Sequence, residues 1–213
     1  MRPEHASSGR SRRYGCVLFD LDNTLVDTDS LTRQTLIDCG AAGVESMAVG
    51  QLRSCSPAAL LVSLSSSAGR RDFERHLLAR IGAGVELLDA QARQVLDTLV
   101  LRKVLLGIVT SRPKAVAQAL LRSCKLKRFF ESCLVTYGSC GARKPHPGPL
   151  ITALRMLGHP CEGAIYVGDS QADAQASRSA GVHFGYAGWA RPCGEPPHAD
   201  LFLKNMSDLL QYT

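Results

Sequence analysis

Two aspartates follow a short apolar run near the start of the sequence. Residues 16–19 (Cys-Val-Leu-Phe) lead directly into Asp20, and Asp22 follows after one further residue. An unbroken apolar run is typical of a strand covered on both faces of a parallel sheet, and Asp is expected where such a strand ends. Two carboxylates at that edge can bind a divalent cation or share proton chemistry. The alternative interpretation is a simple turn, in which Asp bonds its own backbone.

A second expected strand, residues 104–109, ends in two hydroxyl residues. Thr110 and Ser111 stand just before a helix expected over 113–125. Hydroxyls at this position can cap the helix, and together with free backbone N–H groups they can also bind an anion such as phosphate. Both interpretations fit the same geometry.

Lys144 follows a third expected strand, residues 132–137, and lies among prolines. The segment 141–149 reads Gly-Ala-Arg-Lys-Pro-His-Pro-Gly-Pro and leads into a helix expected to end at 157. Because residues before proline are restricted to extended conformations, Lys144 is expected in a defined position. We interpret it as a fixed ammonium that faces the carboxylates; the alternative is a solvated surface charge.

A fourth strand, expected over 164–168, ends in another acid. Asp169 follows it directly, and Asp173 lies in the first turn of a helix expected over 170–180, where an acid also interacts favourably with the helix dipole. A strand at 182–186, a short strand at 200–203 and a helix from Ser207 complete the pattern. Strands that alternate with helices predict a parallel sheet.

The elements that must position these residues form two parts. From residue 29 to about 101 the apolar residues recur at helical spacing, with Gly- and Ser-rich breaks. We therefore expect an α/β core domain, a Rossmann-like parallel sheet sandwiched by helices, built from 14–28 and 100–213. An all-helical cap domain, 29–99, is inserted into it, with hinges near 26–29 and 82–86.

The composition is that of an ordinary globular protein. The net charge of +6 is shared equally between residues 1–13, which we expect to be a disordered basic leader, and the rest of the chain. A remainder of +3 is too weak to indicate nucleic-acid binding, and no apolar run is long enough to span a bilayer. The eight cysteines never form Cys-x-x-Cys, so free thiols are favoured over zinc or disulfides, and a cytoplasmic protein is expected.

Taken together, four segments resemble the ordered motifs of the haloacid dehalogenase superfamily of hydrolases. They are 20–24 (Asp-Leu-Asp-Asn-Thr), 110–111 (Thr-Ser), 144–145 (Lys-Pro) and 168–173 (Gly-Asp-Ser-Gln-Ala-Asp). The similarity continues over 173–181 with phosphoglycolate phosphatase-like members, whose small helical cap the insert also resembles. Each motif alone is weak, but four in this order at strand ends are specific.

The resemblance implies a role for each motif residue. Asp20 would be the nucleophile that forms an aspartyl-phosphate, and Asp22 the general acid and base. Thr110 and Ser111 would hold the phosphoryl oxygens, and Lys144 would balance their charge. Because dehalogenase members lack the second acid, its presence favours phosphate chemistry.

The resemblance also implies a Mg²⁺ cofactor. The ion would bind the Asp20 carboxylate, the Asp22 backbone carbonyl and Asp169, with Thr24 and Asp173 in supporting positions. Carboxylate oxygens are the ligands that Mg²⁺ prefers, and with the ammonium they would offset repulsion between a carboxylate nucleophile and an anionic phosphate.

These expectations lead to a Mg²⁺-dependent phosphatase that acts on a small phosphorylated metabolite, such as a phosphoglycolate-like or sugar phosphate. The alternatives are a phosphomutase and a non-catalytic binding module on the same fold. A monomer or a homodimer is expected, with no nucleic-acid or membrane partner. Most of the basic residues of the cap are expected on solvated helix faces, with some as candidate substrate contacts: Arg33, Arg53, Arg70, Arg71, Arg75, His76 and Arg80.

Overall fold

The computed structural model describes residues 13–54, 57–63, 68–87, 89–190 and 195–213. Within them, six strands form one sheet in the order β3-β2-β1-β4-β5-β6, and every neighbouring pair is parallel. The strands are β1 (Cys16–Phe19), β2 (Leu105–Val109), β3 (Leu134–Val135), β4 (Ala164–Gly168), β5 (His183–Ala187) and β6 (Leu201–Leu203). The order reverses at β1, so the carboxyl ends of β1 and β4 border the crevice in which ligands bind in open α/β sheets.

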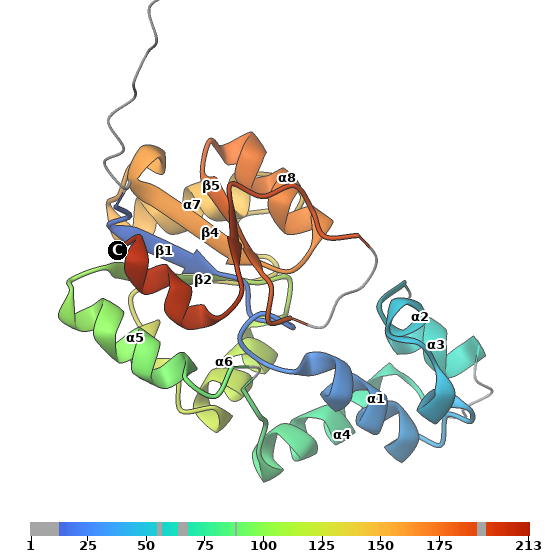
Figure 1. Ribbon diagram of the computed structural model, residues 1–213. Helices are drawn as coiled ribbons and strands as arrows, with labels where there is room; N and C mark the ends of the chain where they lie inside the picture. The colour runs from blue at the N-terminus through green and yellow to red at the C-terminus, as the bar shows by residue number, and fades with distance from the viewer. Residues whose placement is uncertain (1–12, 55–56, 64–67, 88, 191–194) are drawn as a thin grey trace, which may run out of the picture.

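Helices cover both faces of this sheet (Figure 1). Because successive strand residues point to opposite faces, Leu18 and Tyr166 pack in the apolar cluster formed with α7 and α8, whereas Val17 and Phe19 pack in the cluster formed with α5 and α6. This two-sided burial explains the unbroken apolar run of β1 and confirms the predicted α/β fold. The covering helices are α5 (Ala92–Leu101), α6 (Lys114–Ser123), α7 (Gly148–Leu157) and α8 (Gln171–Ala180), with short 3₁₀ turns η2 (Lys127–Phe129), η3 (Cys161–Gly163) and η4 (Met206–Gln211).

Four further helices lie between β1 and β2 and form a group beside the sheet (Figure 1). They are α1 (Thr28–Asp38), α2 (Val49–Ser54), α3 (Pro57–Ser63) and α4 (Arg70–Ala83), with the turn η1 (Val44–Ser46). We call this group the cap. The chain enters and leaves it at one place, because Val26 and Leu87 form an antiparallel bridge and Asp27 N–H donates to the Glu86 carbonyl at 3.4 Å.

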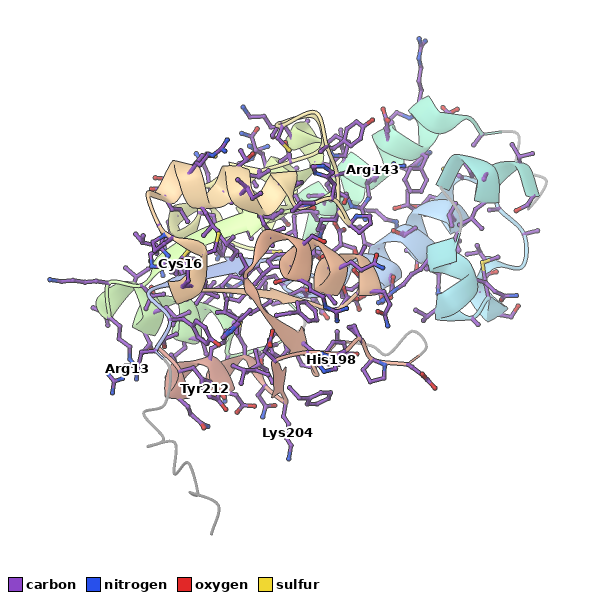
Figure 2. The ribbon with its side chains drawn as sticks, turned by 90° about the horizontal axis from the view of Figure 1, so that it is seen from above. Arg13, Cys16, Arg143, His198, Lys204 and Tyr212 are labelled. Carbon is purple, nitrogen blue, oxygen red and sulfur yellow. The ribbon has the colours of Figure 1, made fainter. Side chains whose placement is uncertain are left out.

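The division into domains is a proposal. The expected cap ended at residue 99, but α5 packs against β2 and η4 of the core. We therefore propose that the cap ends near Glu86. Figure 2 shows Cys16, at the start of β1, at the end of the core away from the cap, and Arg143 on the side turned toward it. The carboxyl ends of the strands thus point to the cap.

Some elements are shorter than the sequence pattern predicts. β3 ends at Val135, because the next N–H that faces β2, that of Tyr137, donates to the Arg112 carbonyl in the loop after β2 (2.9 Å). The last element is the 3₁₀ turn η4 rather than an α-helix. The helix expected from Pro113 begins at Lys114, with Pro113 as its cap residue.

The described cysteines are thiols, of which Cys16, Cys39, Cys124 and Cys133 are buried and Cys140 and Cys161 are partly exposed. The predicted leader lies outside the described residues except for Arg13. Among the described helices, none has the length and apolar character needed to cross a bilayer.

Candidate active site

Asp20 is fixed at the end of β1 and is 4% exposed. Its backbone N–H donates to the Val167 carbonyl of β4 at 2.8 Å, which extends the sheet bonding by one residue. The chain then turns sharply, with two N–H groups on the Leu21 carbonyl and Asn23 at φ 57°, a conformation that Asn tolerates. Asp20 is therefore held at the sheet edge, while Asp22 lies on the turn.

Lys144 connects Asp20 to the rest of the site. Its ammonium lies 2.5 Å from Asp20 Oδ1, 2.6 Å from Asp173 Oδ1 and 2.8 Å from the Tyr166 hydroxyl. The Tyr166 hydroxyl is also 3.1 Å from the Val109 carbonyl. The Lys144 side chain is only 7% exposed, so it is the fixed ammonium that the proline-rich segment suggested.

Asp173 anchors this ammonium from the first turn of α8. Its Oδ2 accepts from the Ser170 N–H (3.1 Å) and hydroxyl (2.6 Å), which forms a capping box at the start of the helix. A Cβ on Gly168 would lie 2.7 Å from the Asp173 carboxyl carbon, so only glycine lets this carboxylate lie against the strand end. Asp173 therefore caps its own helix and holds Lys144 beside Asp20 with the same carboxylate.

Asp22 lies in a second group of polar side chains. Its Oδ1 accepts from Arg112 Nε at 2.7 Å, and its Oδ2 accepts from the Thr110 hydroxyl at 3.2 Å. The Thr110 hydroxyl in turn accepts from the Arg112 N–H at 3.1 Å. The carboxylate is therefore linked to the end of β2.

Asp169, at the end of β4, contacts the cap. Its Oδ2 lies 2.9 Å from one terminal nitrogen of Arg53, a residue of α2. The Nε and other terminal nitrogen of Arg53 bond Asp29, which also accepts from the Asn23 amide at 3.0 Å. An ion pair thus connects the cap to the core at the carboxyl edge of the sheet.

Three carboxylates come close enough to hold one cation. Ligand oxygens of Asp20, Asp169 and Asp173 all lie within 4.8 Å of one another. Burial raises the pKa of Asp20 well above its ordinary value, against the opposing effect of Lys144. Burial likewise raises the pKa of Asp169 to about 6, with Arg53 opposing.

For the other two charged groups of the cluster, Asp173 and Lys144, the pKa shifts favour the charged form. Burial alone would raise the pKa of Asp173, but Lys144 and hydrogen bonds from Ser170 and Tyr166 outweigh it and lower that pKa. Burial would lower the pKa of Lys144, but Asp173 and Asp20 outweigh it and raise that pKa. The Asp173 carboxylate accepts from four donors, which is why its pKa is lowered although it is as deeply buried as Asp20.

A pocket of about 390 Å³ lies between the cap and the sheet edge. Its lining combines the Asp22 group with cap residues: Asp22, Asn23, Thr28, Asp29, Thr32, Leu52, Arg53, Ser111, Arg112 and Pro113. Ser111 is exposed here, whereas Thr24 is buried. The Thr24 hydroxyl has no hydrogen-bond partner among the described residues, and its carbonyl accepts from the Trp189 indole at 2.7 Å.

The structure thus brings the predicted residues to one sheet edge in two groups, with Asp20, Asp169, Asp173 and Lys144 in one, and Asp22 with Thr110 in the other. Sequence reasoning missed Tyr166 and Arg112. The only available signals were a hydroxyl within a buried strand and a cation beside the Thr-Ser pair.

Arg53 was one of seven basic cap residues, and nothing in the sequence distinguished it. The others with described contacts behave differently: Arg33 bonds cap carbonyls, Arg75 pairs with Asp72 and Arg80 pairs with Asp38.

Comparison with known proteins agrees with this geometry. The phosphoglycolate phosphatase of Xylella fastidiosa (strain 9a5c) is 32% identical over 208 residues, which span 91% of this chain and 87% of that protein. A Lactobacillus plantarum structure named as a phosphoglycolate phosphatase matches with a TM-score of 0.74 at 21% identity, over 94% of this chain and 100% of that chain. A Thermotoga maritima structure named as a β-phosphoglucomutase matches with a TM-score of 0.65 at 19% identity, over 80% and 84%.

At such identities the two structures show the fold alone. The family model described as haloacid dehalogenase-like hydrolase matches residues 17–187, which include all four motif segments and the cap. This match confirms the resemblance inferred from the motifs: the chain belongs to the haloacid dehalogenase-like hydrolases.

Proposed function

We propose that the protein is a Mg²⁺-dependent phosphatase that hydrolyses a small phosphomonoester through an aspartyl-phosphate on Asp20. The observation that carries the proposal is the buried ion pair of Asp20 with Lys144, beside a pocket that Asp22 lines. The ammonium offsets the repulsion between a carboxylate nucleophile and an anionic phosphoryl group. The predicted enzyme class, a phosphoric monoester hydrolase, is confirmed by the family and its relatives.

The residues divide the reaction between them. An oxygen of Asp20 attacks phosphorus while the bond from phosphorus to the alcohol oxygen breaks, and Asp22 gives a proton to that oxygen. Water then attacks the aspartyl-phosphate as Asp22 takes its proton, which releases inorganic phosphate and restores Asp20. The Thr110 and Ser111 hydroxyls and Lys144 hold the phosphoryl oxygens, and the cap limits access of bulk water.

The donor set fits Mg²⁺, because buried carboxylate oxygens at this spacing are the ligands that the ion prefers. We assign Asp20, the Asp22 carbonyl and Asp169 as its ligands. Asp173 supports them through Lys144, since its own oxygens already accept from four donors. When bound, the ion would neutralise negative charge on the phosphoryl oxygens.

Two wider properties belong to the same proposal. A cytoplasmic location agrees with the described cysteines being thiols, because thiols persist in reducing compartments. The substrate is a small phosphorylated metabolite. Phosphoglycolate is the candidate that the name of the Xylella fastidiosa relative suggests.

Substitution of the nucleophile tests the proposal. Asp20→Asn should lower the rate of phosphate release from p-nitrophenyl phosphate and 2-phosphoglycolate, with Mg²⁺ present, by at least about 10³-fold, because an amide cannot form the phosphoenzyme. The circular dichroism spectrum should not change. The control is Asp97→Asn, an exposed acid of α5 paired with Arg128, which should keep full activity.

Three results would contradict the proposal in different ways. Activity of Asp20→Asn equal to wild type would remove Asp20 as the nucleophile. An isomeric sugar phosphate formed without free phosphate would indicate a phosphomutase. A well-folded wild-type protein that turns over no ester in a metabolite panel would indicate a binding module.

A further inference from the structure

Arg112 places a guanidinium directly on the proposed general acid and base. Its Nε donates to Asp22 Oδ1 at 2.7 Å, and the two side chains are 21% and 23% exposed. The other Asp22 oxygen accepts from Thr110. Both oxygens of Asp22 are therefore engaged, and one must be released before the carboxylate can face the oxygen of a leaving alcohol.

The backbone around Arg112 is fixed, so its side chain starts from a defined point. Its N–H donates to the Thr110 hydroxyl, and its carbonyl accepts from the Tyr137 N–H at 2.9 Å. The guanidinium can therefore change partner by side-chain rotation alone. Such an exchange needs no movement of β2 or of the helix that follows.

The two arginines that line the pocket differ in what they can still bind. Arg53 uses Nε and both terminal nitrogens on Asp29 and Asp169. Among the described residues, the Arg112 side chain bonds Asp22 alone, through Nε. Both of its terminal nitrogens, each with two N–H donors, thus remain for a ligand in the pocket.

We propose that Arg112 selects the substrate by exchanging Asp22 for a second anionic group on the leaving alcohol, which frees Asp22 to act. This inference rests on the proposed phosphatase function and names its substrate class: a short phosphomonoester whose alcohol part carries a carboxylate or a second phosphate. A carboxylate or phosphate matches the planar fork of a guanidinium, so it competes well for this residue. An ester whose alcohol part is uncharged, called a neutral ester below, leaves Arg112 on Asp22 and reacts slowly.

Steady-state kinetics with paired esters test this role. The anionic esters are 2-phosphoglycolate, with a carboxylate, and ethane-1,2-diol bisphosphate, with a second phosphate; ethyl phosphate is the neutral partner. Arg112→Gln should lower kcat/KM for the preferred anionic ester by about 50-fold, mainly through KM, because a charged hydrogen-bond donor is lost. Ethyl phosphate should lose less than threefold or gain, since Asp22 is released. Arg112→Lys should restore part of the lost kcat/KM. The control Arg122→Gln, on the exposed end of α6, should change kcat/KM for neither kind of ester.

Two comparisons keep this test separate from the proposed function. p-Nitrophenolate leaves without needing a proton from Asp22. Asp20-dependent hydrolysis of p-nitrophenyl phosphate should therefore persist in Arg112→Gln, and this persistence shows that the phosphatase reaction itself is intact. Calorimetric titration in an Asp20→Asn background measures binding without turnover, and there Arg112→Gln should weaken binding of the anionic ester alone. An equal loss for anionic and neutral esters, or no loss for either anionic ester, would overturn the role of Arg112. If the wild type hydrolyses neither p-nitrophenyl phosphate nor either anionic ester, the phosphatase proposal itself fails.

Discussion

At the scale of single residues, two basic side chains of the site pair with several buried carboxylates. Lys144 lies between Asp20 and Asp173, and Arg53 lies on Asp169. Breaking a buried pair leaves an uncompensated charge and typically costs about 3–5 kcal/mol. Because acidic side chains outnumber basic ones at the sheet edge, the site is suited to bind a divalent cation.

The buried thiols give a residue-scale prediction. Burial raises the pKa of Cys16 to about 12, with Cys133 adding to the shift, and raises the pKa of Cys124 and of Cys133 to about 11. A raised pKa means less thiolate, so at pH 8 iodoacetamide should leave these three unmodified and react with Cys140 and Cys161, which are partly exposed. Peptide mass spectrometry reports each cysteine separately.

The pH dependence supplies the control for that prediction. Because the raised pKa values lie at 11 or above, an increase from pH 8 to pH 9.5 should add almost no alkylation at the three buried sites. Unfolding in guanidinium should expose them all. Alkylation of Cys16 in the native protein at pH 8 would contradict the burial of β1.

Asp20, Thr110 and Asp169 could be predicted from the sequence because each directly follows an apolar strand, and the end of such a strand is visible as a change in pattern. Arg112 and Tyr166 could not be predicted. Their roles depend on which way a side chain turns and which strand lies beside it, and neither property has a periodicity along the chain. Arg53 is harder still, since it reaches Asp169 across 116 residues of sequence.

At the scale of elements, α2 of the cap is tied to the end of β4 by one ion pair. The Arg53 side chain is 20% exposed and that of Asp169 is 6% exposed, so this pair is shielded from water far better than the surface pairs of the cap. It also uses a carboxylate that we assign to Mg²⁺. The position of α2 and the binding of the cation are therefore linked.

Removal of this ion pair should loosen the cap. Arg53→Gln should increase amide hydrogen exchange in α2 and the adjoining cap, because a charged hydrogen bond of about 1.5–3 kcal/mol is lost. The sheet strands should keep their protection. Arg75→Gln is the matched control, since its pair with Asp72 is solvent-exposed at 71% and 46%. Equal exchange rates in wild type and Arg53→Gln would show that other contacts hold α2.

The helices and strands could be predicted where burial determines the sequence pattern. Their ends could not be predicted where local hydrogen bonds determine them. The apolar runs of β1 and β4 and the amphipathic faces of α5 and α6 are visible in the sequence because each packs on a core cluster. The end of β3 is not visible, because it depends on the Tyr137 N–H bonding a carbonyl of the loop after β2.

At the scale of the whole molecule, cap and core are joined by two adjacent crossings and by contacts of α4 with α6. The Ser123 hydroxyl donates to the Ile81 carbonyl at 2.7 Å, near the place where the chain returns to the core. Contacts near the crossings thus fix one side of the cap, while the Arg53 pair holds the side over the site. Closure over a substrate would then be a rotation about the crossings.

A cation bound only by the folded chain should stabilise the whole molecule. At a Mg²⁺ concentration of 100 times Kd, mass action adds about 2.7 kcal/mol to the free energy of unfolding, a rise in Tm of roughly 5–10 °C for a chain of this size. EDTA should reverse the rise, as measured by differential scanning calorimetry. Asp169→Asn should abolish it, whereas the surface variant Asp97→Asn should retain it. Because the unfolded chain does not hold the carboxylates of Asp20 and Asp169 together, a wild-type Tm indifferent to Mg²⁺ would contradict the proposed metal site, and a rise that persists in Asp169→Asn would move it to other ligands.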